Sequence, residues 1–168
     1  AAADQLIIAW GRTYSIPYVI LRPTNNYGIG QYVEKLIPKS IKYLGLNKPI
    51  PLHNGGKPIR NWLHANDTAE SVLTIIDSNV KNEIYNICGG FEQNNLDTVK
   101  QIIKSYHNTD LTPEEISTYL DLSYSRQGQD VRYALNDDKL RKLGWCPKIV
   151  FADELPKIVN SLKENFIW

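Results

Sequence analysis

The chain has 168 residues, of which 42% are hydrophobic and 22% are charged. This composition is typical of a folded globular domain and excludes a disordered or fibrous chain. Nineteen basic residues against 18 acidic ones leave a net charge of +1, without the dense basic stripe that a nucleic-acid-binding protein carries. No apolar run approaches 18 residues, so we expect no membrane-spanning segment.

The sequence contains no methionine and opens directly on a helical pattern. Leu6, Ile7, Trp10 and Tyr14 recur at helical spacing, which predicts an amphipathic helix over residues 1 to about 15. No capping residue precedes this helix. We therefore expect the sequence to begin inside a longer protein.

An apolar segment between two prolines follows, at residues 17–23, and predicts a strand buried on both faces of a parallel sheet. Residues 24–30 form a polar, glycine-bearing loop in this interpretation, and residues 33–46 form the next helix. A short extended segment at 49–53 then ends in a turn at 54–56.

The second half of the chain alternates between the same two patterns. Strands are predicted at 59–64 and 83–88, and an extended segment at 120–125. Asn66 or Asp67 is expected to cap one helix, and Asn136 a brief later one. Thr112 opens a capping box with proline at the first helical position. Two further helices are marked by inward-facing apolar residues. The first contains Leu96, Val99, Ile103 and Tyr106. The last helix starts at Asp153 and contains Leu155, Ile158, Val159, Leu162 and Phe166.

This alternation predicts an α/β fold. Only residues 17–23 and 83–88 have the apolar character of core parallel strands, whereas a doubly wound sheet normally has more. Either the sheet is completed elsewhere or the chain is incomplete.

Several common catalytic and metal-binding patterns are missing from the sequence. Gly28-Ile29-Gly30 lacks the third glycine of a dinucleotide fingerprint and is more typical of a tight turn. No nucleophile elbow is found. The histidines have no metal-ligand spacing, so no metal site is predicted. Cys88 and Cys146 fit no zinc or redox spacing, and free thiols favour a reducing, cytoplasmic location.

Four polar residues are candidates for ligand binding. Asn25 and Asn26 follow a predicted parallel strand, at the end where ligands of α/β proteins bind, although both also suit an ordinary turn. Arg60 and Arg126 lie beside glycine-containing loops, and a guanidinium can hold a diphosphate with two parallel hydrogen bonds. A surface salt bridge is the alternative for either arginine.

Six ordered segments carry a resemblance to a known family. They are Asn25-Asn26-Tyr27-Gly28, Glu34-Lys35-Leu36-Ile37-Pro38, Ile59-Arg60-Asn61-Trp62-Leu63, Ile84-Tyr85-Asn86-Ile87, Asn95-Leu96-Asp97 and Arg126-Gln127-Gly128-Gln129-Asp130. Over residues 1 to about 145 the chain resembles the nucleotide-diphosphate-sugar 4,6-dehydratases, dTDP-glucose 4,6-dehydratases in particular, which are extended short-chain dehydrogenases.

The resemblance implies a two-part fold. The last strands of an NAD(P)-binding Rossmann-type sheet would comprise residues 1–30 and about 65–107. The small carboxy-terminal α/β substrate-binding subdomain would comprise about 31–64 and 108–168.

The resemblance also implies a lyase reaction on a dTDP- or UDP-sugar: NAD-dependent oxidation at C4, dehydration across C5–C6 and reduction at C6. In this family the glycine-rich NAD loop and the catalytic Tyr-x-x-x-Lys precede the segment corresponding to residue 1. We therefore expect no catalytic residue here and no turnover by the chain alone, with homodimerisation through the first helix. An epimerase or reductase of nucleotide sugars, or a non-catalytic binding module, remains an alternative.

Carried over by position, Asn25 would touch the substrate and Asn26 the nicotinamide side of NAD. The family implies that Arg60 holds the diphosphate and that Asn95 contacts a nucleotide group. Glu34 and Lys35 would border the sugar nucleotide, with Lys35 near its diphosphate. The nucleobase would pack on Pro51, Leu52 and His53. The loop of Ser125, Arg126, Gln127, Gly128 and Gln129 would close over the nucleotide through Arg126. The family often has proline and histidine in place of Gln127 and Gln129. It commonly has tyrosine in place of His53, so thymine and uracil nucleotides both remain open.

Overall fold

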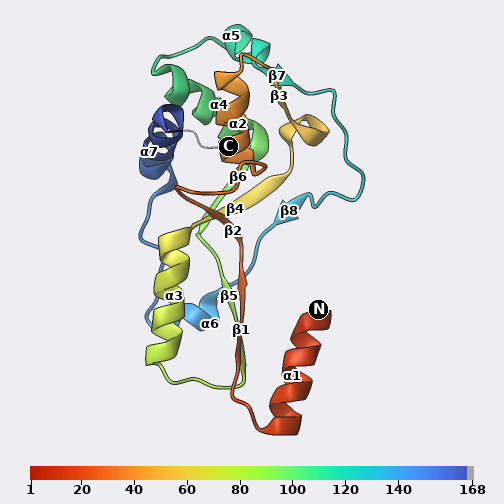
Figure 1. Ribbon diagram of the computed structural model, residues 1–168, viewed down its shortest axis with the longest axis vertical. Helices are drawn as coiled ribbons and strands as arrows, with labels where there is room; N and C mark the ends of the chain where they lie inside the picture. The colour runs from red at the N-terminus through yellow and green to blue at the C-terminus, as the bar shows by residue number, and fades with distance from the viewer. Residues whose placement is uncertain (166–168) are drawn as a thin grey trace.

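The computed structural model describes residues 1–165, so Phe166, predicted to face inward, lies outside the described residues. The molecule is elongated, with two groups of helices stacked along its long axis and strands running between them (Figure 1). No helix in the described part is long and apolar enough to cross a membrane.

The first group is built on a two-stranded parallel sheet. β1 (Val19–Pro23) pairs with β5 (Glu83–Ile87), while α1 (Ala2–Tyr14) and α3 (Ala65–Asp77) lie on opposite sides of the two strands (Figure 1). The expectation that the first strand is buried on both faces is wrong, because only Ile20 of β1 is buried. Among the described residues β1 has β5 as its single neighbour, and α1 buries none of its side chains.

A second sheet is organised around β4 (Ile59–His64). β2 (Asn25–Tyr27) and β8 (Arg132–Tyr133) pair with β4 in parallel, and β6 (Phe91–Asn94) pairs with it in antiparallel. Residues 25–27 are thus a short strand and not part of a loop, since pairing with β4 satisfies their backbone groups.

A third pair of short parallel strands, β3 (Ile50–Pro51) and β7 (Leu120–Asp121), lies at the far end of the molecule. β3 leads into a 3-10 turn, η1 (His53–Gly56). The capping box at Thr112 is confirmed: its side chain accepts a hydrogen bond from the Glu115 amide at the start of α5 (Pro113–Thr118).

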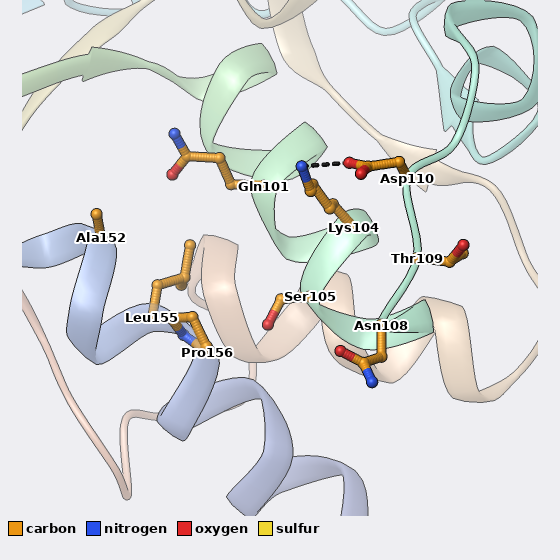
Figure 2. Close-up of a pocket in the computed structure, with 9 residues that line it drawn as sticks. All are labelled: Gln101, Lys104, Ser105, Asn108, Thr109, Asp110, Ala152, Leu155 and Pro156. Atoms are coloured by element: carbon orange, nitrogen blue, oxygen red, sulfur yellow. Dashed lines mark ion pairs between the residues drawn. The ribbon is translucent and has the colours of Figure 1, made fainter.

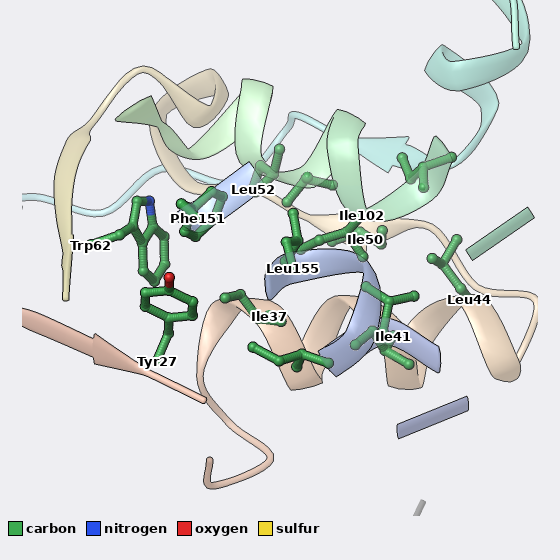
Figure 3. Close-up of a cluster of buried hydrophobic side chains, with 14 residues drawn as sticks. Tyr27, Ile37, Ile41, Leu44, Ile50, Leu52, Trp62, Ile102, Phe151 and Leu155 are labelled. Atoms are coloured by element: carbon green, nitrogen blue, oxygen red, sulfur yellow. The ribbon is translucent and has the colours of Figure 1, made fainter. Parts of the chain in front are cut away.

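The larger apolar cluster is formed mainly by three helices, α2 (Leu36–Gly45), α4 (Asn95–His107) and α7 (Phe151–Glu164), and extends to Tyr27 and Trp62 (Figure 3). A smaller cluster joins β5 to α3 and α6 (Asp138–Arg141); its buried members are Leu63, Ile75, Tyr85, Ile87, Leu140 and Trp145. In these clusters α4 packs with α2 and α7, while residues 138–145 pack against β5.

Four helix starts differ from the sequence expectations. α2 begins at Leu36, which leaves Glu34 and Lys35 in the preceding turn. α3 is capped by His64, whose Nδ1 accepts from the Asn66 amide at 3.2 Å. The cap of α6 is Asp137, although the Asn136 side chain accepts from the Asp138 amide. α7 begins at Phe151, two residues before Asp153.

Candidate functional site

The site lies where the chain passes from one sheet to the other. β1 continues almost directly into β2, and Thr24 between them is the point at which the partner strand changes from β5 to β4. The Thr24 amide donates to the Ile87 carbonyl at 2.9 Å, and its hydroxyl donates to Asn61 Oδ1 at 3.0 Å. The same Asn61 oxygen accepts from the Gly89 amide at 2.8 Å. The buried Asn61 thus fixes both strand ends at the crossing.

Gly89 allows this close approach of the two sheets. A Cβ at Gly89 would lie 1.7 Å from the Trp62 carbonyl oxygen, a separation that no side chain tolerates. The backbone of β4 therefore contacts the backbone just after β5, close to the crossing at Thr24.

A cavity of about 520 Å³ opens at this crossing. Its wall combines residues from β2, the turn before α2, β4, the start of α4 and the segment before β8. The lining residues are Thr24, Asn25, Asn26, Gln31, Tyr32, Lys35, Leu36, Arg60, Trp62, Asn95 and Gln129. Two of these side chains are cationic and none carries a carboxylate, so the described wall favours an anionic ligand.

Three polar atoms of lining residues are buried and lack a hydrogen-bond partner: Asn25 Oδ1, Gln31 Oε1 and Trp62 Nε1. Leaving such groups unpaired costs about 1–3 kcal/mol each. Buried polar groups in folded proteins are normally satisfied, so this arrangement is poor for stability alone. It matches a ligand with both donors and acceptors, which is the chemistry of a sugar.

Arg60 enters the cavity from β4 and is half-buried. Its Nη1 donates to the Ile59 carbonyl at 2.8 Å and to the Asp130 carbonyl at 3.1 Å. These bonds orient the guanidinium between β4 and the segment that precedes β8. The side chain is therefore held in place before any anion binds.

Asn26 has a different environment from Asn25. Its Nδ2 donates to the Thr24 carbonyl, and its Oδ1 accepts from the Thr68 hydroxyl at 2.7 Å. Asn26 also borders a smaller hollow of about 210 Å³, lined by Asn26, Tyr27, Gly28, Ile29, Gly30, Gln31 and Ala65. The two hollows share Asn26 and Gln31, so a ligand in the larger cavity and a ligand in the smaller hollow would meet at these two residues.

Tyr27 lines the smaller hollow and is also part of the larger apolar cluster. Its ring packs edge-on against Trp62 and His64, at centroid distances of 6.1 and 5.1 Å. Burial raises the pKa of the Tyr27 hydroxyl, and the negative charges of Asp67 and Glu154 act in the same direction. Tyr27 therefore stays neutral, which suits a packing role.

Six of the predicted site residues line the larger cavity: Asn25, Asn26, Lys35, Arg60, Asn95 and Gln129. The remaining predicted residues lie outside this wall. Leu52 is part of the core, and the His53 ring contacts Tyr124 at 5.8 Å between centroids. Glu34 and the four residues from Ser125 to Gly128 are exposed, and Pro51 is half-buried in β3. The binding roles given to these residues stay predictions.

Five lining residues were not predicted: Thr24, Gln31, Tyr32, Leu36 and Trp62. Gln31 and Tyr32 directly follow the predicted loop at the strand end, so their position was a usable signal. Nothing in the sequence distinguishes Trp62 from an ordinary aromatic residue of a buried strand.

A separate hollow of about 450 Å³ lies between the end of α4 and the start of α7 (Figure 2). Lys104 and Asp110 form an ion pair on one side of it, and Leu155 of the core lies on the other. None of the predicted site residues borders this hollow.

Comparisons with known proteins identify relatives of the chain. The chain is 39% identical to the dTDP-glucose 4,6-dehydratase of Neisseria gonorrhoeae and 38% identical to that of Haemophilus influenzae, with 98% and 95% of the chain covered. It covers 49% of either relative, so the chain spans about half the length of the curated relatives it matches.

The chain is also similar to a crystal structure of a dTDP-glucose 4,6-dehydratase from Streptomyces venezuelae with NAD bound, with a TM-score of 0.86 and 32% sequence identity. The match covers 96% of this chain and 48% of that one. The predicted fold class, a partial Rossmann-type sheet with a smaller α/β part, is thereby confirmed. The family model for the NAD dependent epimerase/dehydratase family matches residues 1–88. Since these residues make up more than half of the sequence, the chain belongs to the NAD dependent epimerase/dehydratase family.

Proposed function

We propose that the chain is the nucleotide-sugar-binding part of a dTDP-glucose 4,6-dehydratase. The observation that carries the proposal is the cavity at the sheet crossing, where cationic side chains, unpaired buried polar atoms and six predicted residues come together. The named relatives support the same reaction class.

Within this cavity the diphosphate is bound by Arg60 and Lys35, the two cationic residues of its wall. Asn25, Gln31 and Trp62 face the sugar and satisfy their unpaired atoms with its hydroxyl groups. Asn95, at the start of α4, takes a polar group of the nucleoside, with Glu34 at the outer edge. These contacts orient the sugar and exclude water from it. They therefore contribute to the reaction by positioning the substrate and not by transferring protons.

The nucleoside end lies toward η1 and the segment before β8. In this proposal Pro51, Leu52 and His53 form the base-side wall, and Ser125, Arg126, Gln127, Gly128 and Gln129 cover the nucleotide. His53 Nδ1 is buried without a partner, which leaves an imidazole group to recognise a base.

NAD, when bound, supplies the hydride acceptor for oxidation at C4 and the donor for reduction at C6. The described residues fit one end of this cofactor: the hollow beside Asn26 shares Asn26 and Gln31 with the larger cavity, but its volume of about 210 Å³ is too small for a dinucleotide. We propose that the rest of NAD and the catalytic groups are held by sequence beyond these 168 residues. The chain alone then has no turnover.

Assembly and location are part of the same proposal. Leu6, Ile7 and Trp10 are exposed on α1, and we propose that this helix pairs two copies of the protein. The free thiols of Cys88 and Cys146 support a cytoplasmic location.

Calorimetric titration with dTDP tests the proposal directly. We expect saturable binding, with UDP as a competitor that establishes the base preference, and no 4-keto-6-deoxy product from dTDP-glucose and NAD. Absence of dTDP and UDP binding would contradict the binding role. Product formation would contradict the claim that the catalytic groups lie elsewhere.

A further inference from the structure

The segment of residues 122–130 lies beside the cavity and has little burial to hold it in place. It forms no helix or strand, and the side chains from Leu122 to Gly128 are exposed. Only Gln129, at its end, is half-buried and lines the cavity. The conformation of this segment therefore depends on hydrogen bonds from neighbouring elements.

Most of these bonds come from a single residue, Asn54 of η1. Its backbone amide donates to the Tyr124 carbonyl at 2.9 Å. Its side-chain oxygen accepts from the Arg126 amide at 3.1 Å and from the Ser125 hydroxyl at 3.3 Å. Its side-chain nitrogen donates to the Arg126 carbonyl at 3.1 Å and to Gln129 Oε1 at 3.0 Å.

The turn that carries Asn54 is firmly attached to the core. A Cβ at Gly56 would lie 2.8 Å from Leu96 Cβ and 2.9 Å from the Leu96 amide, so η1 packs directly on the first turn of α4. The Asn95 amide donates to the Pro58 carbonyl at 3.1 Å. The turn η1 is therefore anchored independently of residues 122–130, and these residues are held in place by η1.

Asn54 adopts a left-handed backbone conformation, with φ of 53° and ψ of 38°. Asparagine and glycine both occupy this region readily, whereas most residues do so at a cost. Replacement by glycine thus removes the side chain without straining the backbone.

We infer that Asn54 is a positioning residue that holds Arg126 and Gln129 at the mouth of the cavity. It contacts the backbone on both sides of the Arg126 Cα atom and the Gln129 side chain, so one residue fixes where both side chains start. This inference rests on the proposed nucleotide-binding function only for the consequence that ligand affinity depends on Asn54.

Hydrogen exchange of the Arg126 amide in the free chain tests the contact without any ligand. In Asn54→Gly we expect this amide to exchange about tenfold faster, because its acceptor is lost. Asn54→Asp keeps the accepting oxygen and should retain the protection. Asn47→Gly is the matched control, since Asn47 has a φ of 51° and its side chain forms no hydrogen bond in the described structure. Unchanged exchange at Arg126 in Asn54→Gly would overturn the inference.

Titration with dTDP then tests the consequence. We expect Asn54→Gly to bind dTDP about fivefold more weakly, and to have a smaller effect in an Arg126→Ala background, where only the contact with Gln129 remains to be lost. Fully additive losses would show that Asn54 does not act through Arg126 and would overturn the inference. If the wild-type chain binds no dTDP, the proposed function fails, and the Arg126 exchange rates still decide the role of Asn54.

Discussion

Arg60 is placed by its own backbone contacts before a ligand arrives. Its Nη1 bonds to the Ile59 and Asp130 carbonyls restrict the guanidinium to one region of the cavity wall. A preorganised, partly desolvated guanidinium binds a diphosphate strongly, because little side-chain entropy is lost on binding.

Arg60→Ala should therefore weaken dTDP binding by about 2–3 kcal/mol, or roughly 30- to 150-fold in Kd, measured by calorimetry. Arg60→Lys keeps the charge but loses the planar fork, so an intermediate loss is expected. Arg12→Ala, on the exposed face of α1, is the control and should leave the affinity unchanged. Wild-type affinity in Arg60→Ala with the fold intact would remove Arg60 from the site.

Individual site residues differ in how visible they are in the sequence. Asn25 and Arg60 were predictable as candidates, because a polar residue after a parallel strand and an arginine beside a glycine loop both have a physical reason to bind anions. The unpaired state of Trp62 Nε1 was not, since it depends on which groups from other segments come within hydrogen-bond distance of it. Asn54 was predicted only as part of a turn, because its partners lie more than 70 positions away.

Among the helices, α4 links the core to the cavity, because its buried face joins the larger cluster while its first residue, Asn95, lines the site. The start of α4 is fixed by Asn94, whose Oδ1 accepts from the Asp97 amide at 2.7 Å. Its Nδ2 also donates to the Asp97 carboxylate at 2.7 Å.

Asn94→Ala should lower the free energy of unfolding by about 1 kcal/mol, because the capping bond at the helix start is lost. Urea denaturation measures this change. Asn94→Ser keeps an oxygen acceptor at the cap and should lie within a few tenths of a kcal/mol of wild type. Equal losses in both variants would show that the capping bond is not the source of stability.

The predictability of whole elements follows from how local their signals are. The strand at 59–64 and the capping box at Thr112 were predicted with the observed residues, because apolar pattern and capping chemistry are encoded within a few positions. β2, β6 and β8 are short and polar, and they form strands only because β4 lies beside them. The cap of α3 was assigned to Asn66 or Asp67, since a histidine cap such as His64 is unusual.

For the molecule as a whole, α1 presents an uncovered apolar surface. Leu6 and Trp10 are 60% and 56% exposed, and they border a hollow of about 320 Å³ with Ile7, Gly11, Ile16 and Tyr18. Contiguous exposed apolar surface of this kind drives association in water. The chain should therefore self-associate in solution.

Trp10→Asp should shift the chain toward the monomer, because a charge would then be buried at the proposed contact between copies. Sedimentation velocity across a concentration series measures the shift. Leu46→Asp, at an exposed apolar position after α2, is the control and should leave self-association unchanged. A wild-type chain that stays monomeric at all concentrations would contradict pairing through α1.

The overall architecture was predictable in class but not in its internal grouping. Alternating patterns were sufficient to predict an α/β fold with parallel strands in the segments 17–23 and 83–88. They did not show that α4 joins the cluster of α2 and α7, because the apolar stripe of a helix does not specify its partner.

The crossing at Thr24 separates two kinds of wall around the cavity. One side is made by Asn25 and Trp62, whose strands are joined at the crossing by the buried Asn61 and by the backbone contact at Gly89, and so by folding itself. On the other side lies Gln129, and its exposed segment, residues 122–130, is joined to the turn at residues 53–55 by a few polar bonds. Under the proposed function, we therefore expect that exchanging these two turns together changes the base preference, while the sugar-facing residues stay unchanged.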